Sequence, residues 1–180
     1  PICLVLHPHP RQGGTMNNKL VYNTYQAFKK SNFSTLRFNF RGVGKSLGTY
    51  DSGVGELTDA AAALDWLQSE NPAAKTTWIA GFSFGAWLSL QLLMRRPEIS
   101  GFVAISPPAS LYDFSFLAPC PASGLIIQGT EDKIVKEEAV SELVEKLNKQ
   151  KNITIDYKKI NGADNFFNKN LEDIQKKIVK

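Results

Sequence analysis

Apolar residues form short runs that alternate with stretches in which apolar and polar positions mix. A short, continuous apolar run is typical of a strand that is buried on both faces. Strands are predicted over residues 2–6, 35–40, 78–82, 101–106 and 124–129. Residues 153–157 alternate between apolar and polar positions and are followed by two lysines, which predicts a half-exposed strand at the edge of a sheet.

The stretches between these runs carry apolar residues at helical spacing. In the first of them, Leu20, Val21 and Phe28 supply one inward face. Helices are predicted over about 17–30, 56–69 and 136–149, over an apolar stretch directly after residue 85, and from near Leu171 onward.

Strands that alternate with helices predict an α/β fold. We expect a three-layer α/β/α arrangement around a doubly wound, mostly parallel sheet, with ligands at the carboxyl ends of the strands. At 180 residues and 43% hydrophobic content, the chain has the length of one domain, residues 1–180. It begins at Pro1, almost directly in a strand, so further N-terminal strands are expected to precede it.

One turn carries a candidate for chemistry. Residues 81–85, with the sequence GFSFG, join the strand near Trp78 to an apolar helix. A serine at the apex of such a turn is held in strained backbone geometry with its hydroxyl projecting from the sheet, and the glycines permit the tight packing around it. Ser83 is therefore a predicted nucleophile. The alternative is an ordinary turn that contains a serine.

Acyl transfer from a serine needs amide donors for the oxyanion and an acid that orients the base. The predicted donors are the N–H groups of Phe84, directly after the serine, and of His9, in a loop whose two prolines have no N–H. Asp132 follows a later strand and is the predicted acid. Its alternative role is that of a helix-capping or surface carboxylate. Asp113, one strand earlier, is a second and weaker candidate for the acid.

Four motifs, in this order, resemble the α/β-hydrolase superfamily: residues 6–18, 36–46, 81–85 and 128–133. The chain is particularly similar to the small, lidless bacterial group related to dienelactone hydrolases and acyl-peptidase catalytic domains. The similarity covers essentially the whole chain. It implies a minimal α/β-hydrolase fold without a lid, and a serine hydrolase that acts on an ester, thioester or related acyl compound.

The resemblance also implies a general base, and there the chain departs from the group. The group has a histidine before two phenylalanines in its final loop, and this chain has Asn165 at that position. A carboxamide does not titrate near neutral pH and cannot take the proton of the serine. What is then left is the acceleration from the oxyanion hole and substrate binding, about 10³–10⁴ over water in well-studied serine hydrolases.

Three explanations of Asn165 stay open. It is natural, and the chain is a catalytically inactive α/β-hydrolase-fold protein that binds a ligand or partner; or it was introduced to trap a substrate complex; or His7 or His9 serves as a substitute base. These are the only histidines in the chain. Both could instead be structural residues of a proline-fixed loop.

Charge bears on the substrate. Residues 1–50 contain seven basic and no acidic residues, whereas residues 51–180 contain fourteen basic and seventeen acidic residues. Arg11, Arg41 and Lys45 predict a basic rim and an anionic acyl substrate, with chance and ordinary solvated faces as the alternative. We expect His7 to contribute to substrate binding as well.

The loop over residues 107–121 is the only stretch able to cover the cleft, and it is too short for a helical lid. Tyr112, Phe114 or Phe116 is predicted to line or support the acyl side, with core packing as the alternative. Residues 42–46, with the sequence GVGKS, look like the tail of a phosphate-binding loop, but Asn39 stands where that motif needs glycine and no helix follows.

Composition points away from several other classes. The sequence has no nucleic-acid-binding motif, no apolar stretch of membrane-spanning length and no signal peptide. Two cysteines give no disulfide framework, so a cytoplasmic setting is expected. Cysteines and histidines lack metal-ligand spacing, so we expect neither a metal nor an organic cofactor. The predicted partner is a small-molecule substrate, and the predicted state is a monomer or homodimer.

Overall fold

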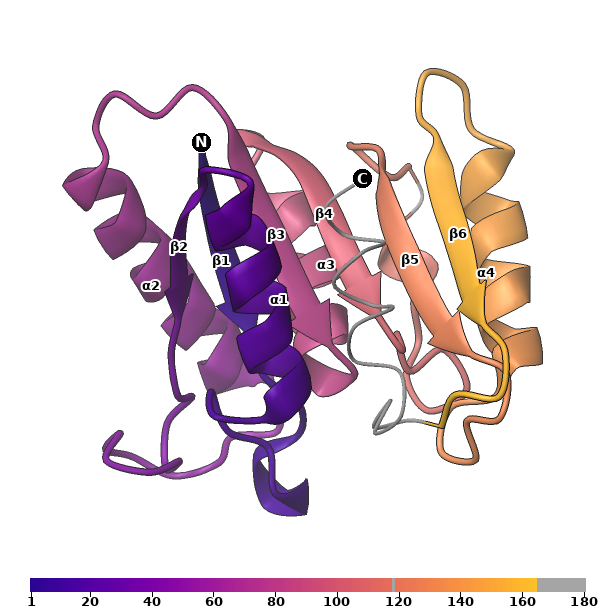
Figure 1. The fold of residues 1–180 in the computed structure, drawn as a ribbon, viewed down its shortest axis with the longest axis horizontal. Coiled ribbons are helices and arrows are strands. Elements are labelled where there is room, and N and C mark those ends of the chain that lie inside the picture. Colours follow the sequence, from indigo (N-terminus) through magenta and orange to yellow (C-terminus); the bar gives the residue numbers. More distant parts are fainter. Residues whose placement is uncertain (118, 165–180) are drawn as a thin grey trace.

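The computed structural model describes residues 1–117 and 119–164, and these form a single sheet flanked by helices (Figure 1). Every neighbouring pair of strands is parallel, in the order β2-β1-β3-β4-β5-β6. The strands are β1 (Ile2–Leu6), β2 (Ser34–Arg37), β3 (Thr77–Phe82), β4 (Ile99–Ile105), β5 (Gly124–Gly129) and β6 (Ile155–Ile160). The doubly wound α/β fold expected from the sequence is confirmed.

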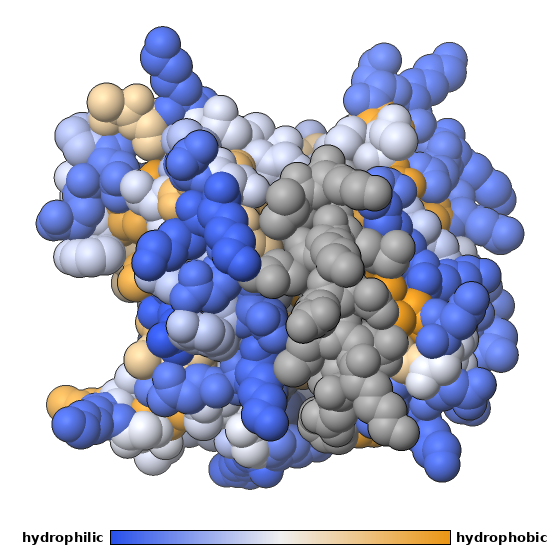
Figure 2. Space-filling view, viewed as in Figure 1, coloured by the Kyte–Doolittle hydropathy of each residue, from blue (hydrophilic) through white to orange (hydrophobic). Residues whose placement is uncertain are grey.

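Helices cover both faces of this sheet. They are α1 (Lys19–Lys30), α2 (Val54–Glu70), α3 (Phe84–Arg95) and α4 (Glu137–Asn148), with 3-10 turns at Pro10–Gln12 and Ser115–Leu117. The apolar face of α1 packs on one side of the sheet, and α2, α3 and α4 pack on the other. Figure 2 shows that the outer face of α1 is hydrophilic, as an amphipathic helix requires.

Two helix starts differ from their predicted positions because of capping. The Asn18 side chain accepts hydrogen bonds from the N–H groups of Leu20 and Val21, so α1 begins at Lys19. Helix α2 begins earlier than predicted, at Val54. There the buried carboxylate of Glu56 accepts hydrogen bonds from the N–H groups of Asp51 and Gly53, both at 2.9 Å.

Two strands also differ. Strand β2 ends at Arg37 rather than at residue 40, because the Phe40 N–H donates to the His7 ring instead of to a neighbouring strand. Strand β6 is shifted to Ile155–Ile160, and the N–H of Thr154 donates to the Ser123 hydroxyl just before it. In the described sheet β6 is an edge strand, as predicted.

All strands run in one direction, so the loops that follow them meet at one edge of the sheet, at the arrowheads in Figure 1. The segments after β1, β3 and β5 carry the candidate site residues at this edge. The last predicted helix lies outside the described residues. Within residues 1–117 and 119–164, no helix has both the length and the hydrophobicity that a membrane span requires.

Candidate active site

Ser83 occupies the turn between β3 and α3 in a backbone conformation that is rare for a residue with a side chain. Its φ is 54° and its ψ is −112°. Such strain costs about 1–3 kcal/mol and persists only where the surroundings impose it. Here the Ser83 N–H donates to the Ile105 carbonyl (2.9 Å), and the Ser83 carbonyl accepts from the Trp87 N–H (3.1 Å). The predicted strand–turn–helix is confirmed.

The two glycines of the motif are needed for close packing. A Cβ at Gly85 would collide with the backbone carbonyl oxygens of Leu6 and His7 at the end of β1. A Cβ at Gly81 would collide with the Gly85 carbonyl. The serine turn is therefore pressed directly against the loop after β1, which carries His9.

Ser83 lies at a small pocket of about 100 Å³. The other lining residues come from the segments after β1, the end of β3 and the loop after β5: Pro8, His9, Gln12, Gly13, Asn18, Phe82 and Ile134. Phe84 is the first residue of α3, where a backbone N–H has no partner within the helix and the helix dipole favours negative charge. In the described part of the chain, the His9 N–H donates to no protein acceptor. Of the two predicted oxyanion donors, Phe84 thus follows Ser83 at the start of α3, and His9 lines the same pocket as Ser83.

The His7 ring is fully buried and turned into the fold. Its Nδ1–H donates to the Pro8 carbonyl (2.7 Å), and its Nε2 accepts from the Phe40 N–H (3.0 Å). Because Nε2 accepts, the ring is neutral, and burial lowers its pKa to about 4. Both ring nitrogens are occupied by backbone groups, so His7 joins the loop after β1 to the loop after β2.

The buried neutral His7 predicts a loss of stability in mild acid. In the unfolded chain the imidazole has a pKa of 6.5 and binds a proton in mild acid, whereas in the folded chain its pKa is about 4 and it stays neutral. Stability is therefore full above pH 6.5 and falls as the pH drops toward 4. We expect about 2 kcal/mol to be lost between pH 7 and pH 5. Urea unfolding should show a loss of at least this size, and the loss should be smaller by about 2 kcal/mol in His7→Gln. Parallel pH profiles for both chains would contradict the assignment.

His9 lies closer to the serine but is also engaged. Its Nδ1 accepts from the Arg11 N–H (3.1 Å), and its Nε2 lies 3.0 Å from the Tyr50 hydroxyl. Partial burial, with Arg11 nearby, lowers its pKa. Among the described residues, neither His7 nor His9 forms a hydrogen bond with Ser83. The geometry gives no support to a substitute base from these two residues.

Asp132 is held rigidly in the loop after β5. Its Oδ1 accepts from the N–H groups of Ile134 (2.9 Å) and Val135 (2.8 Å), and its Oδ2 accepts from Gln128 Nε2 (3.1 Å). It does not cap α4, which starts at Glu137 without a side-chain cap, and it is only 8% exposed. The capping and surface alternatives are thereby set aside. Sequence reasoning missed the support from buried Gln128.

The loop that leads to position 165 is joined to the Asp132 loop. The Glu131 N–H donates to the Ala163 carbonyl (2.9 Å), and the Gly162 N–H donates to the Thr130 hydroxyl (2.8 Å). Asn165 itself lies outside the described residues. The preceding residues nevertheless run beside the predicted acid, at the same edge of the sheet.

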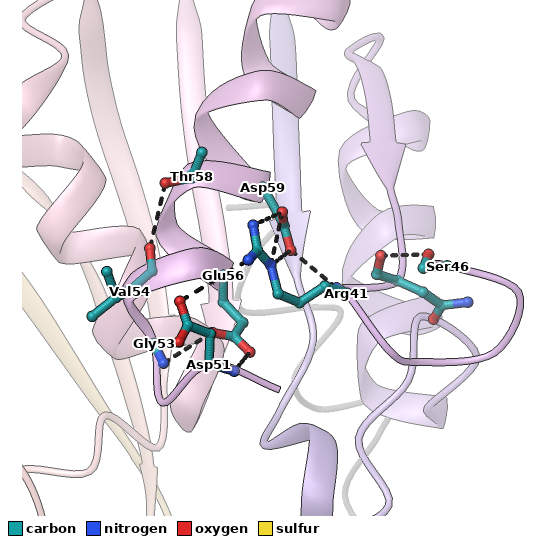
Figure 3. Close-up of polar contacts among 9 residues, drawn as sticks. Arg41, Ser46, Asp51, Gly53, Val54, Glu56, Thr58 and Asp59 are labelled. Atoms are coloured by element: carbon teal, nitrogen blue, oxygen red, sulfur yellow. Dashed lines mark hydrogen bonds and ion pairs between the residues drawn. The ribbon is translucent and has the colours of Figure 1, made fainter. Parts of the chain in front are cut away.

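The predicted basic rim is only partly available for a substrate. Figure 3 shows the Arg41 guanidinium directed at Asp59, with Nη2 to Oδ1 at 2.9 Å and Nε to Oδ2 at 3.1 Å. These hydrogen bonds raise the pKa of Arg41. The Arg11 guanidinium lies over the Tyr50 ring, 4.6 Å from its centroid. Neither arginine lines the Ser83 pocket.

Other predicted residues lie apart from the serine pocket. Tyr112 stacks on Trp87 with ring centroids 4.2 Å apart. It lines a different pocket, of about 220 Å³, together with Phe114 and residues of α4 between Ala139 and Lys146. The Ser46 hydroxyl donates to the Asn39 carbonyl, which makes residues 42–46 a closed loop rather than a phosphate cradle (Figure 3). Sequence reasoning missed Gln12, Asn18 and Ile134 in the Ser83 pocket.

Comparison with known proteins places this chain in a family. The model of the X-Pro dipeptidyl-peptidase (S15) family matches residues 1–119. An uncharacterized protein of Rickettsia prowazekii is 58% identical over 182 residues, which cover 99% of this chain and 76% of that protein.

Solved structures agree. A protein of unknown function from Agrobacterium tumefaciens superposes with a TM-score of 0.96 at 56% identity, covering 98% of this chain and 81% of that one. A Xanthomonas campestris protein, described as an α/β serine hydrolase without a lid, gives a TM-score of 0.90 at 35% identity, with 98% and 78% covered. The chain therefore belongs to the X-Pro dipeptidyl-peptidase (S15) family, within the α/β-hydrolase superfamily.

Proposed function

We propose that this chain is a serine hydrolase for an ester, thioester or related acyl compound, with Ser83 as its nucleophile. The observation that carries the proposal is the strained Ser83 turn, which lies at a pocket that His9 also lines and is followed directly by Phe84 at the start of α3. Fixed donors at the place where negative charge develops are usually the largest single contribution to acyl transfer. The family model and the serine hydrolase described above support the same reaction class.

With a histidine at position 165, as in the group that the sequence resembles, the Ser83 hydroxyl oxygen would attack the carbonyl carbon, and its proton would pass to that imidazole, which Asp132 would orient. The carbonyl π electrons move to oxygen, and the N–H groups of His9 and Phe84 stabilise that oxyanion. Collapse expels the alcohol or thiol, which takes the proton from the base. Water then releases the acid from the acyl-serine by the same steps.

The base is the weak point of this chain. The Asn165 carboxamide cannot accept the serine proton, and the ring nitrogens of His7 and His9 are engaged by other groups. We therefore propose that the chain retains the acylation site with impaired turnover, limited to what the oxyanion hole and binding supply.

A fluorophosphonate probe, which phosphorylates an activated serine, tests the proposal. We expect strong labelling of Asn165→His, weak labelling of the unaltered chain, and none after Ser83→Ala in either background. Labelling that survives Ser83→Ala would assign the nucleophile elsewhere. Absence of labelling in Asn165→His, with the fold intact by circular dichroism, would refute the hydrolase assignment.

A second candidate function is a non-catalytic binding protein of the same fold. Asn165 favours this candidate specifically, because the imidazoles of His7 and His9 already form hydrogen bonds with other groups. The serine then has no proton acceptor among the chain's histidines. This candidate predicts ligand binding at the Ser83 pocket that survives Ser83→Ala. It also predicts no labelling in any background.

A further inference from the structure

No described residue with a charged side chain lines the Ser83 pocket. Its polar lining consists of neutral groups, namely the serine, the His9 imidazole and the carboxamides of Gln12 and Asn18. The nearest predicted cations are directed elsewhere, Arg41 toward Asp59 and Arg11 over Tyr50. Burying a carboxylate without a cation is costly. The pocket chemistry thus favours a neutral acyl group over an anionic one.

The orientation of the Asn18 carboxamide is fixed by the helix that it caps. Its oxygen accepts from the N–H groups of Leu20 (2.9 Å) and Val21 (3.3 Å), and only an oxygen can accept from both. The other terminal atom of this carboxamide is therefore the amide nitrogen, Nδ2. Among the described residues nothing accepts a hydrogen bond from Asn18 Nδ2. A half-buried residue of the pocket wall thus holds an unused donor.

The backbone around this donor is braced. The Asn18 N–H donates to the Thr15 carbonyl (3.1 Å), and the Met16 N–H donates to Asn39 Oδ1 (2.9 Å). Arg37 Nη1 donates to the Met16 carbonyl (2.6 Å) and to Asn17 Oδ1 (2.9 Å). A donor held in this way loses little conformational entropy when a ligand accepts from it.

We propose that Asn18 is a specificity-determining residue whose Nδ2 donates a hydrogen bond to an oxygen on the acyl chain of the substrate. The preferred substrates are esters or thioesters of short, neutral, oxygen-bearing acyl groups. The inference deepens the proposed function and rests on it. A pocket of about 100 Å³ admits an acyl group of only a few non-hydrogen atoms. An alkyl chain of the same length would leave the donor unpaired, which lowers its relative rate.

The test compares p-nitrophenyl methoxyacetate with p-nitrophenyl butyrate in the Asn165→His background. The two acyl groups have the same length and differ by an ether oxygen, which can only accept a hydrogen bond. Because that oxygen also activates the ester, the readout is the change in the ratio of kcat/KM values between variants. Asn18→Asp retains the capping oxygen and replaces the donor by an acceptor. It is expected to lower the methoxyacetate-to-butyrate ratio about 10-fold.

Asn17→Asp is the matched control. It adds the same charge at the neighbouring position, outside the pocket wall, and should leave the ratio unchanged. p-Nitrophenyl hemisuccinate tests the anionic alternative and is expected to be the poorest of the three substrates. An unchanged ratio in Asn18→Asp, an equal fall in both variants, or a preference for hemisuccinate would overturn the inference.

A binding measurement separates this inference from the hydrolase assignment. In Ser83→Ala, methoxyacetamide is expected to shift the Asn18 side-chain amide resonances in NMR spectra and to bind more tightly than butyramide. If Asn165→His neither hydrolyses esters nor reacts with the fluorophosphonate, the hydrolase assignment fails, but these shifts still decide the ligand class. Equal binding of both amides, with the Asn18 resonances unmoved, would refute the role of Asn18.

Discussion

Asn165→His is expected to raise kcat/KM for activated esters about 10²–10⁴-fold over the unaltered chain, the usual contribution of a positioned general base. The strained Ser83 turn, the proposed amide donors of His9 and Phe84 and the buried Asp132 are already in place. In the proposed mechanism the missing part is a group that takes the serine proton. Steady-state hydrolysis of p-nitrophenyl acetate by the two chains measures the gain.

The pH dependence identifies the new group. Only the neutral imidazole accepts a proton, so kcat/KM of Asn165→His should rise with pH through a pKa near the ordinary histidine value of about 6.5. Asn165→Gln preserves a carboxamide and should gain nothing. A gain that is independent of pH, or that persists after Ser83→Ala, would contradict the triad.

Gly85→Ala is expected to destabilise the fold by more than about 3 kcal/mol, beyond the usual cost of one added methyl group in a packed site. The new Cβ would collide with the carbonyl oxygens of Leu6 and His7. These backbone atoms cannot move away as the end of a flexible side chain can. Helix propensity alone would favour alanine by up to about 1 kcal/mol, so the collision must outweigh that gain. Urea unfolding with a constant m-value gives the difference in the free energy of unfolding.

Gly162→Ala is the control for this substitution. Gly162 has a φ of 75° and no atom near its virtual Cβ, so alanine there pays backbone strain of only about 1–2 kcal/mol. Gly85→Ala should also abolish labelling of Ser83 in the Asn165→His background, because the loop that carries His9 must move. A Gly85→Ala chain as stable as Gly162→Ala would show that the serine turn is less tightly packed than the structure indicates.

Much of the fold followed from the apolar pattern, and the deviations have local causes. The central strands β1, β3, β4 and β5 were predicted closely, because a short, continuous apolar run fits few structures other than a strand that is buried on both faces. Predictions failed at element ends, where side chains take over backbone hydrogen bonds. Asn18 starts α1, and His7 ends β2 by accepting from the Phe40 N–H.

The site was predicted in part, and the rest depended on contacts between distant segments. The serine turn has a local signature, so Ser83 and Phe84 could be located from sequence. Arg41 was predicted to face a substrate, but in the structure it binds Asp59. The sequence could not indicate this partner, because Asp59 lies on α2 and no spacing rule joins the two residues. Asn18 was overlooked because a helix cap is ordinarily a sufficient role for asparagine. That its amide nitrogen has no acceptor among the described residues became relevant only once the pocket was known.

The hydrogen bonds between the loops after β5 and β6 have a consequence for motion. Thr130 and Glu131 donate from their backbone N–H groups to the carbonyl oxygens of Ile160 and Ala163, and Gly162 donates back to the Thr130 hydroxyl. Neither loop can open without breaking bonds to the other, so their amides should exchange with solvent in one shared opening event. The loop that carries Asp132 and the segment up to Ala163 would then open and close as one unit.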